Sequence, residues 1–446
     1  MKRELFEDAP IPYAYLKMSV PVVLAMVLNV VYNMVDTWFI SLTGDPNLVA
    51  GVSVCAPIFV LSIAMGDIWG LGGSSLISRL LGEKKDRQAG GVSALCLYAA
   101  FFTGLLFMIV MMLFRNSILH ILGANDGSMS HASAYFIWIA LGTPFIIFSM
   151  IPNNQLRTEG LANYGMWGAV TGTVANIVLD PIFIFVLHMG AAGAALATSI
   201  SNLISCILYI LIIKKKCNVL TLNPKAALGS INKITEVLRI GIPASVTNIM
   251  NSLSMMVTNR FLEPYGNGCI AAMGIAMKIN MISLMTIIGF AFGGQPLYGY
   301  CYGNRNGHRF RKTMRFAYSL EAGLGVVFAL ILSVLAPYLL SFFMNDTAVV
   351  SAGVTMLRYM QISALLVGVT LVSTCMCQAV GNARGALILS LLRQGVLFVA
   401  AIYMLHALIG FNGILAAQPL SDLLTGIIAL IIVFRILGSE ESLKIG

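Results

Sequence analysis

The chain has 446 residues, of which 58% are hydrophobic and only 10% are charged. Soluble domains carry about 25% charged residues, so this composition excludes a water-exposed globular protein. The formal net charge is +9, but the basic residues stand in short loops between apolar runs. That placement indicates membrane orientation and argues against a nucleic-acid partner.

Apolar runs long enough to cross a hydrocarbon core of about 30 Å recur along the whole chain. The opening segment MKRELFEDAPIPYAYLKM leads into an apolar stretch too long for a signal peptide, so we interpret it as a cytoplasmic lead-in. Breaks at charged residues and at Gly, Pro and Asn then divide the chain into twelve predicted helices, an all-α integral membrane fold. They span residues 16–43, 48–79, 90–114, 131–154, 164–187, 191–213, 236–262, 268–300, 315–341, 350–379, 385–408 and 412–436.

The distribution of Lys and Arg predicts the orientation of these spans. Assigning alternate loops to opposite sides puts 23 of the 27 basic residues, Arg393 among them, on one side. Cytoplasmic loops carry the excess of Lys and Arg, so both termini are predicted to face the cytoplasm. We therefore expect a multi-pass protein of a bacterial or archaeal plasma (inner) membrane.

Several catalytic and metal-binding patterns are absent from the sequence. The eight cysteines show no metal-ligand or C-x-x-C spacing, and the five histidines are scattered near helix ends. There is no H-E-x-x-H motif, no nucleophile elbow and no G-x-x-x-x-G-K-[ST] phosphate loop. We expect no enzyme activity and no cofactor, and transport across the membrane would draw on an ion gradient.

The two halves of the chain repeat each other. One constant offset aligns Pro, Asn, Gly and Arg without a gap, as in the pairs Pro21/Pro243, Asn29/Asn251, Gly44/Gly266, Gly72/Gly294 and Arg87/Arg309. Further on, a slightly shorter offset pairs Gly190 with Gly410 and Ser201 with Ser421. Each half has an even number of spans, so the repeats insert in the same orientation.

The repeat predicts three parts. Residues 1–213 form an N-lobe of six helices, 214–235 a cytoplasmic linker, and 236–446 a C-lobe of six helices. Two such bundles around a central cavity provide the geometry of alternating access.

Two aspartates lie inside predicted spans, where an ionisable group costs roughly 2.5–3.5 kcal/mol on insertion scales. Asp36 and Asp180 each stand seven residues before the outer end of their helices. Both are therefore expected about 10 Å below the external surface, where they can share one pocket. Asn29 and Asn33 continue the polar stripe of Asp36 along the first helix.

The helix of Asp180 supplies further oxygen ligands. Asn176 precedes Asp180 by four residues, and Pro181 removes the hydrogen bond to the carbonyl of Ile177. Carboxylates, amide oxygens and a free carbonyl suit a shared proton or a hard cation such as Na⁺, for which Asp36, Asp180 and Asn176 would be the ligands. The alternative is a polar knot that merely holds the helices together.

The repeat carries this acidic pair in one half only. At the corresponding positions Asp36 meets Thr258, and Asp180 falls near Ala401. Ion coupling is therefore predicted for the N-lobe. Loading the site is expected to change the packing of the first helix, with Pro21 and Pro181 as hinge positions.

Four further segments are distinctive: VVYNMVDTWFISLTGDPNLVAGVSV, QLRTEGLANYGMW, NIVLDPIFIF and GGQPLYGYCYGNRN. Together they resemble the multidrug and toxic compound extrusion (MATE) family. The loop LLGEKKDRQAGG lacks the signature of the major facilitator type, which shares the six-plus-six plan. The resemblance covers nearly the whole chain and implies export of bulky organic cations in exchange for H⁺ or Na⁺. It also implies that Tyr135, Asn153 and Thr198 complete the N-lobe cluster.

One departure from the family pattern indicates the branch. The NorM-like branch carries carboxylates inside helices seven and ten. Here helix seven has only Glu263, at its outer end, and helix ten has none. The carboxylates of helices one and five instead resemble the DinF-like and MepA-like branch.

Four other charged residues fall inside predicted spans. Lys278 and Asp422 lie at equal depth in the C-lobe, which suggests an ion pair, although Lys278 can equally extend its amine to the interface. Asp67 and Glu321 lie in the inner half, where packing or gating is the default.

The leading hypothesis is a cation-coupled exporter of drugs, acting on small organic cations among membrane lipids and expected to be a monomer. The alternative is a flippase for lipid-linked oligosaccharides from the same superfamily, whose cavity is lined by several cationic side chains. Few basic residues inside the predicted spans argue against the flippase. A receptor or scaffold would leave the repeat and the acidic pocket without explanation.

Overall fold

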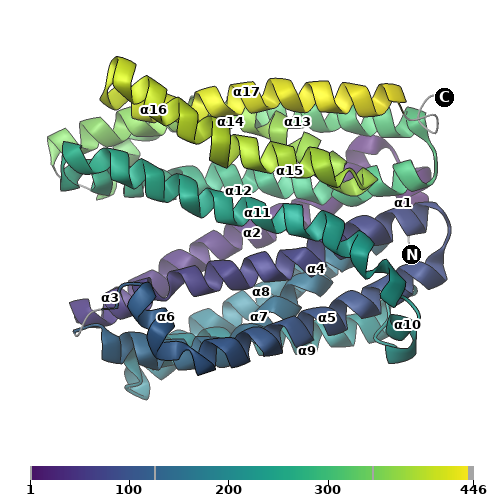
Figure 1. Cartoon of the computed structure of the whole chain (residues 1–446), viewed down its shortest axis with the longest axis horizontal. Helices are drawn as coiled ribbons and strands as arrows, with labels where there is room; N and C mark the ends of the chain where they lie inside the picture. Colours follow the sequence, from purple (N-terminus) through teal and green to yellow (C-terminus); the bar gives the residue numbers. More distant parts are fainter. Residues whose placement is uncertain (1–2, 125–126, 344–345, 440–446) are drawn as a thin grey trace. The chain divides into compact units, whose positions relative to one another are not determined.

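The computed structural model describes residues 3–124, 127–343 and 346–439, which are helical almost throughout and contain no β-strand (Figure 1). Eleven described segments of 25 to 37 residues are long and apolar enough to cross a membrane. Helix α11 (Ile234–Leu262) has 29 residues but holds polar residues such as Glu236, Arg239 and Asn248. The predicted all-α membrane fold is confirmed.

The helices of the first repeat follow the predicted order with short additions. The long helices are α2 (Ile11–Ser41), α4 (Ala56–Gly82), α5 (Asp86–Leu113), α7 (Met129–Leu156), α8 (Ala162–Pro181) and α9 (Gly190–Lys216). The short ones are α1 (Arg3–Glu7), α3 (Pro46–Val54), α6 (Arg115–Ile121) and α10 (Pro224–Leu228). Helix α3 begins where the Asp45 side chain accepts the backbone N–H of Asn47 and Pro46 takes the first helical position.

The second repeat contains α11, α12 (Asn267–Gly303), α13 (Gly307–Phe343), α14 (Thr347–Val380), α15 (Ala383–Leu391), α16 (Leu397–Ile409) and α17 (Phe411–Ser439). Helices α15 and α16 form one span joined by a π-helical turn, η5 (Leu392–Val396). A second π turn, η2 (Ile182–Val186), follows α8.

The backbone confirms the internal repeat. Glycines with positive φ, which other residues adopt only with strain, recur at the same places in both halves. These pairs are Gly44 and Gly266 (φ 68° and 93°), Gly160 and Gly381 (77° and 85°), and Gly190 and Gly410 (55° and 59°). The spacing within each pair follows the register in which the sequence repeats.

The chain divides into two compact units whose limits lie inside two helices. Unit 1 holds the residues up to Leu5 and Leu24–Ser245, and unit 2 holds Phe6–Val23 and everything from Val246 onward. The first part of α2 therefore belongs to unit 2, and the first part of α11 belongs to unit 1. Each division falls shortly after a proline, Pro21 or Pro243.

Close glycine contacts attach these exchanged half-helices to their units. In unit 2, a Cβ on Gly294 would lie 2.2 Å from the ring of Tyr15, and the Tyr15 hydroxyl donates to the carbonyl of Phe290 at 2.9 Å. In unit 1, a Cβ on Gly72 would lie 2.4 Å from the carbonyl oxygen of Val237. Gly72 and Gly294 are repeat equivalents, so both units use the same small-residue contact to hold a half-helix.

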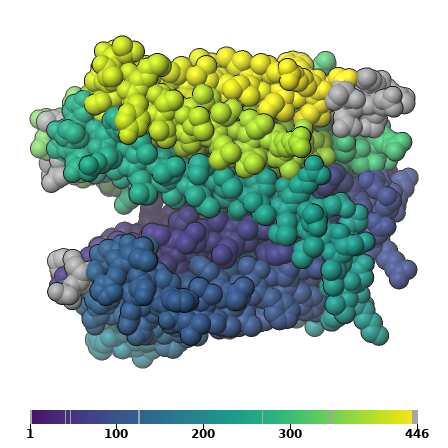
Figure 2. All heavy atoms as spheres, viewed as in Figure 1, coloured from purple at the N-terminus to yellow at the C-terminus, as the bar shows by residue number. Residues whose placement is uncertain are grey.

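Each unit is organised around one central helix. In unit 1, α7 packs against α4, α5, α8 and α9, and in unit 2, α14 packs against α12, α13, α15 and α17. The side chains of α16 and α17 lie against one another along a face of unit 2 (Figure 2). Large apolar side chains point outward from the helices, including Leu113, Val334, Phe342 and Leu408. An outer surface of this kind is suited to lipid, as expected for a multi-pass membrane protein.

The linker is built onto unit 1. The buried carboxylate of Glu159 accepts the backbone N–H groups of Asn218, Val219 and Leu220 at 3.1, 2.9 and 2.6 Å. The Tyr98 hydroxyl donates to the carbonyl of Leu222 at 2.8 Å. These bonds satisfy backbone groups that follow the end of α9, so the linker has a defined path.

The orientation predicted from Lys and Arg can be measured at two exposed positions. In a background without reactive native cysteines, Leu228→Cys should react with a membrane-impermeant maleimide only after cells are opened. Asn47→Cys, at the start of α3, should react in intact cells. Labelling of Leu228→Cys in intact cells would reverse the predicted topology.

Candidate ion-coupling site

The acidic pair is assembled from α2 and α8 within unit 1. Asp36 lies on the part of α2 that belongs to unit 1, and Asp180 is the residue before Pro181 at the end of α8. Proline lacks the N–H that continues an α-helix, and the chain passes from Pro181 into the π turn η2.

The two carboxyl groups meet. The side chains of Asp36 and Asp180 lie within hydrogen-bonding reach of each other. Asp180 is fully buried and Asp36 half-buried. The Oδ1 atom of each is buried without a hydrogen-bond partner among the described residues. Two close carboxylates repel unless a proton or a cation lies between them, so this geometry suits the binding of a positive ion.

Asn176 and Thr198 support the pair. With the amide nitrogen of Asn176 facing α8's aspartate, Asn176 donates to Oδ2 of Asp180 at 2.9 Å and accepts the backbone N–H of Thr198 at 3.0 Å. Asn176 is 1% exposed and Thr198 is 6% exposed. The predicted grouping of Asp36, Asp180, Asn176 and Thr198 is therefore present in the structure.

Two tyrosines face the same cluster. The hydroxyl groups of Tyr32 and Thr198 lie 3.4 Å apart. Tyr135 on α7 lies near enough to interact electrostatically with both carboxylates. The sequence analysis did not select Tyr32, although it stands four residues before Asp36, on the same helix face. The four-residue spacing between Tyr32 and Asp36 was the feature of the sequence that could have placed Tyr32 at this site.

The other predicted residues are placed differently. Asn33 on α2 is exposed, and its amide donates to the carbonyl of Asn29 at 2.7 Å within the same helix. Asn153 and Tyr135 lie near opposite ends of α7. Their separation is about 27 Å along the helix, so the structure does not bring Asn153 to the acidic pair. It lies instead against Gly165, near the start of α8.

Carboxylate and hydroxyl oxygens make up most of the cluster, while Asn176 directs its amide nitrogen toward Asp180. Carboxylate, hydroxyl and amide oxygens are the ligands of hard cations, and the same carboxylates can carry a proton. Among the described residues no group of three or more His, Cys, Asp or Glu side chains is placed to hold a metal ion.

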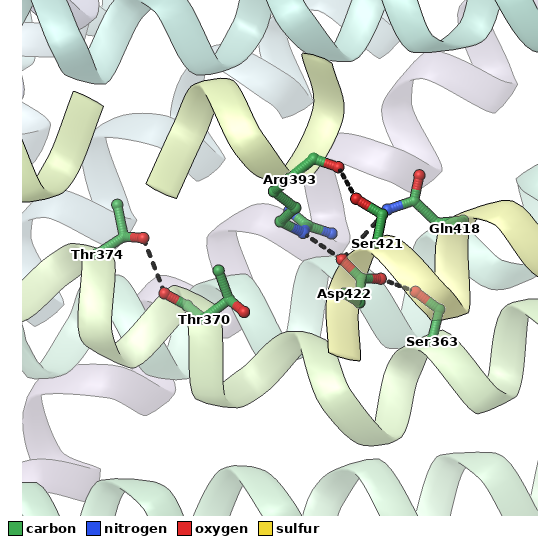
Figure 3. A network of polar contacts seen from close by, with 7 residues as sticks. All are labelled: Ser363, Thr370, Thr374, Arg393, Gln418, Ser421 and Asp422. Atoms are coloured by element: carbon green, nitrogen blue, oxygen red, sulfur yellow. Dashed lines mark hydrogen bonds and ion pairs between the residues drawn. The ribbon is translucent and has the colours of Figure 1, made fainter. Parts of the chain in front are cut away.

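In the C-lobe the predicted pairing of Lys278 with Asp422 is wrong. Asp422 pairs with Arg393, whose Nε donates to Oδ1 at 2.8 Å, as Figure 3 shows. Lys278 is exposed. The sequence analysis places Arg393 with the cytoplasmic basic residues. In the structure its side chain is buried within a spanning segment, Ala383–Ile409. Equal depth of two charges was insufficient because it does not specify which helix faces meet.

The remaining intramembrane acids lie elsewhere. Glu321 on α13 is 1% exposed, and neither carboxyl oxygen has a hydrogen-bond partner in the part of the chain that the structure describes. Its Cβ lies 2.7 Å from the position of a Cβ added to Gly368 on α14. Asp67 is half-buried on α4. Their role in packing or gating stays a prediction.

Comparison with known proteins gives concordant matches. The MatE family model matches residues 21–182 and 243–404, two ranges that correspond to each other in the register of the internal repeat. The multidrug export protein MepA of Staphylococcus aureus strain NCTC 8325 is 30% identical over 432 residues, which cover 96% of this chain and 95% of that protein.

Solved structures also match this chain over nearly its full length. One, described as the outward-facing conformation of a multidrug resistance MATE family transporter of the MOP superfamily, has a TM-score of 0.92 at 24% identity. Another, of MATE in complex with MaD5, has a TM-score of 0.90 at 26% identity. Both matches cover 98% of this chain and 98% of the other.

Proposed function

Because this chain belongs to the MatE family of membrane transporters, we propose that it is a secondary exporter of bulky, often cationic, organic compounds driven by an inward flow of H⁺ or Na⁺. MepA, which it matches over nearly its full length, is a multidrug export protein. The proposal assigns ion coupling to the N-lobe and substrate export to alternating access.

The contact between Asp36 and Asp180 is the observation that supports coupling. Both residues stand in spanning helices, and neither forms an ion pair with a base in the part of the chain that the structure describes. Such an acidic pair is costly in a membrane unless it binds a positive charge. An incoming proton or Na⁺ relieves the repulsion within the pair. It also competes with a cationic substrate for the same negative charge, so uptake of the ion would favour release of the substrate.

The paths of α2 and α11 suggest how such an event would be transmitted. Helix α2 belongs to unit 2 up to Val23 and to unit 1, with Asp36, from Leu24 on. A rearrangement of the units must therefore be accommodated inside α2. Pro21 weakens the helix next to that boundary because it removes one backbone hydrogen bond. Pro181 acts locally, where it ends α8 beside Asp180.

Efflux from proteoliposomes tests the function and the coupling ion together. A lipophilic cation such as tetraphenylphosphonium would be loaded, and a pH gradient and a Na⁺ gradient would be imposed separately at zero membrane potential. Under one of the gradients, efflux is expected to exceed that from loaded vesicles that lack the protein. If neither gradient accelerates efflux, the chain is not a coupled exporter of organic cations.

The flippase alternative has less support. It calls for several cationic side chains inside the bundle. Two bases are buried in the described spans: Arg157, at the end of the span Met129–Glu159, and Arg393, which is paired with Asp422. The same vesicles would test it, because a flippase would move lipid-linked oligosaccharide and would not raise efflux of the lipophilic cation above background.

A further inference from the structure

Arg358 is a charged residue among exposed apolar residues of unit 2. It lies on α14 within the spanning segment Val349–Val380, and its side chain is exposed. Large apolar side chains are exposed on the same two helices, including Val334 and Tyr338 on α13 and Ile362 on α14. A surface of this kind is suited to lipid, where a cation without a partner is costly.

Pro337 on α13 provides an anchor for this arginine. Proline has no N–H, so the carbonyl of Ser333, four residues earlier, lacks its helical hydrogen bond. Nε of Arg358 donates to that carbonyl oxygen at 3.5 Å, a long hydrogen bond. Arg358 makes no ion pair and no other hydrogen bond with the described residues. The guanidinium is therefore held through one nitrogen, and Nη1 and Nη2 remain available to an anion.

A groove between α13 and α14 has Arg358 among its lining residues and a volume of about 550 Å³. Four hydroxyl side chains also line it: Ser341 on α13 and Thr347, Ser351 and Thr355 on α14. The three on α14 precede Arg358 by eleven, seven and three residues, spacings that share one helix face. Ser341 and Thr355 donate to carbonyls of their own helices at 3.1 Å. The hydroxyls of Thr347 and Ser351 have no hydrogen-bond partner among the described residues.

A phosphate group joined to an apolar chain matches this groove. Guanidinium N–H groups bind phosphate oxygens in pairs, and hydroxyls add further donors. Val350 and Val354 give the groove apolar walls, and Tyr338, next to the lining residue Pro337, is 74% exposed. Basic pockets between spanning helices hold lipid head groups. A free anion would use the donors and leave the apolar walls uncovered, whereas a phospholipid covers both.

The first repeat shows that helix packing does not require a charge at this place. In the register of the repeat, Arg358 corresponds to Phe136 on α7, the central helix of unit 1. The surrounding stretch of α7, residues 132–146, contains no charged residue. A central helix can therefore pack on its neighbours without an arginine here, and Arg358 calls for another role.

We propose that Arg358, together with Thr347 and Ser351, binds the phosphate of an anionic phospholipid in the groove between α13 and α14. The predicted orientation puts the start of α14 on the external side, so the lipid would belong to the outer leaflet. The phosphate of phosphatidylglycerol neutralises the guanidinium, whereas a choline head group brings a second positive charge close to it. The inference goes beyond the proposed export function and does not depend on it.

Native mass spectrometry of the purified full chain would measure the dissociation constant of the first bound lipid. Phosphatidylglycerol would be compared with diacylglycerol of the same acyl chains, which lacks the phosphate. Arg358→Gln should raise the dissociation constant for phosphatidylglycerol roughly tenfold, the value of a charge-assisted hydrogen bond. Binding of diacylglycerol should stay unchanged. If Arg358→Gln binds phosphatidylglycerol within about twofold of wild type, the proposal is overturned.

Two further variants separate lipid binding from net charge and from structure. Arg260→Gln removes the same charge at the end of α11, where the side chain is 81% exposed and pairs with Glu263, and should leave both lipid affinities unchanged. Arg358→Lys keeps the charge without the planar fork and should lose only about threefold. An equal loss in Arg358→Lys and Arg358→Gln, with lower melting temperatures in lipid-free detergent, would assign Arg358 to the carbonyl of Ser333 alone and overturn the proposal.

The identity of the occupant is tested by competition. Excess inorganic phosphate should not displace phosphatidylglycerol, because the acyl chains add apolar contacts, and phosphatidylcholine of the same chains should bind more weakly. Displacement by phosphate would assign the groove to a free anion, and equal affinity for phosphatidylcholine would contradict an anionic head group. A dimer that Arg358→Gln abolishes would assign the groove to a second copy of the chain. Each of these three outcomes would overturn the proposal.

Discussion

Asp36→Asn and Asp180→Asn should each abolish gradient-driven efflux while the protein still folds and inserts. Either change leaves one carboxyl group where two share a buried site. The affinity for the coupling ion is then lost, but repulsion between the carboxylates is lost as well, so stability should not fall. Efflux from proteoliposomes, measured beside the melting temperature of the purified variants, reports both effects.

Asp45→Asn is the matched control. Asp45 lies outside the spans and caps α3 through the backbone N–H of Asn47. Asparagine caps helices about as well as aspartate, so this variant should transport like wild type. If the Asp36→Asn, Asp180→Asn double variant still couples efflux to an ion gradient, the assignment is incorrect, and Asp67, Glu321 and Asp422 become the candidates.

Removing either charge of the Arg393–Asp422 pair alone should strongly destabilise the protein. Arg393→Gln leaves the carboxylate of Asp422 buried without its cation, a loss that costs about 3–5 kcal/mol in comparable buried pairs. The double variant Arg393→Gln, Asp422→Asn should recover most of this loss because no lone charge remains. Melting temperatures of the wild type, both single variants and the double variant complete the thermodynamic cycle.

Lys278 supplies the comparison for that cycle. It is exposed and is not the partner of Asp422 in the structure. A cycle of Lys278→Gln with Asp422→Asn should therefore show additive changes. Coupling between Lys278 and Asp422, with none between Arg393 and Asp422, would contradict the observed pairing.

The sequence by itself determined the membrane class, the repeat and the acidic pair. Apolar runs reveal spans because lipid requires continuous apolar surface along a helix. The repeat is visible because its glycines, such as Gly44 and Gly266, hold positive φ in both halves. Asp36 and Asp180 stand out because a carboxylate inside a span is expensive and rare.

Tertiary structure alone decided which polar residues meet. Depth along a helix can be counted, but contact also depends on helix rotation and on which helices are neighbours. Counting placed Lys278 level with Asp422, whereas packing of the span that holds η5 against α17 brought Arg393 to it. Counting depth also did not identify Tyr32, whose hydroxyl lies 3.4 Å from that of Thr198 on another helix.

The division of α2 and α11 between the units was also beyond the sequence. The ranges 1–213 and 236–446 describe where the repeats lie along the chain. The first halves of α2 and α11 nevertheless pack on the opposite repeat, because glycines such as Gly72 and Gly294 allow a second helix to approach closely. Sequence similarity shows which segments are repeats of each other. A compact unit is defined by contacts between helices. These contacts join residues far apart in the chain, so the order of residues does not show them.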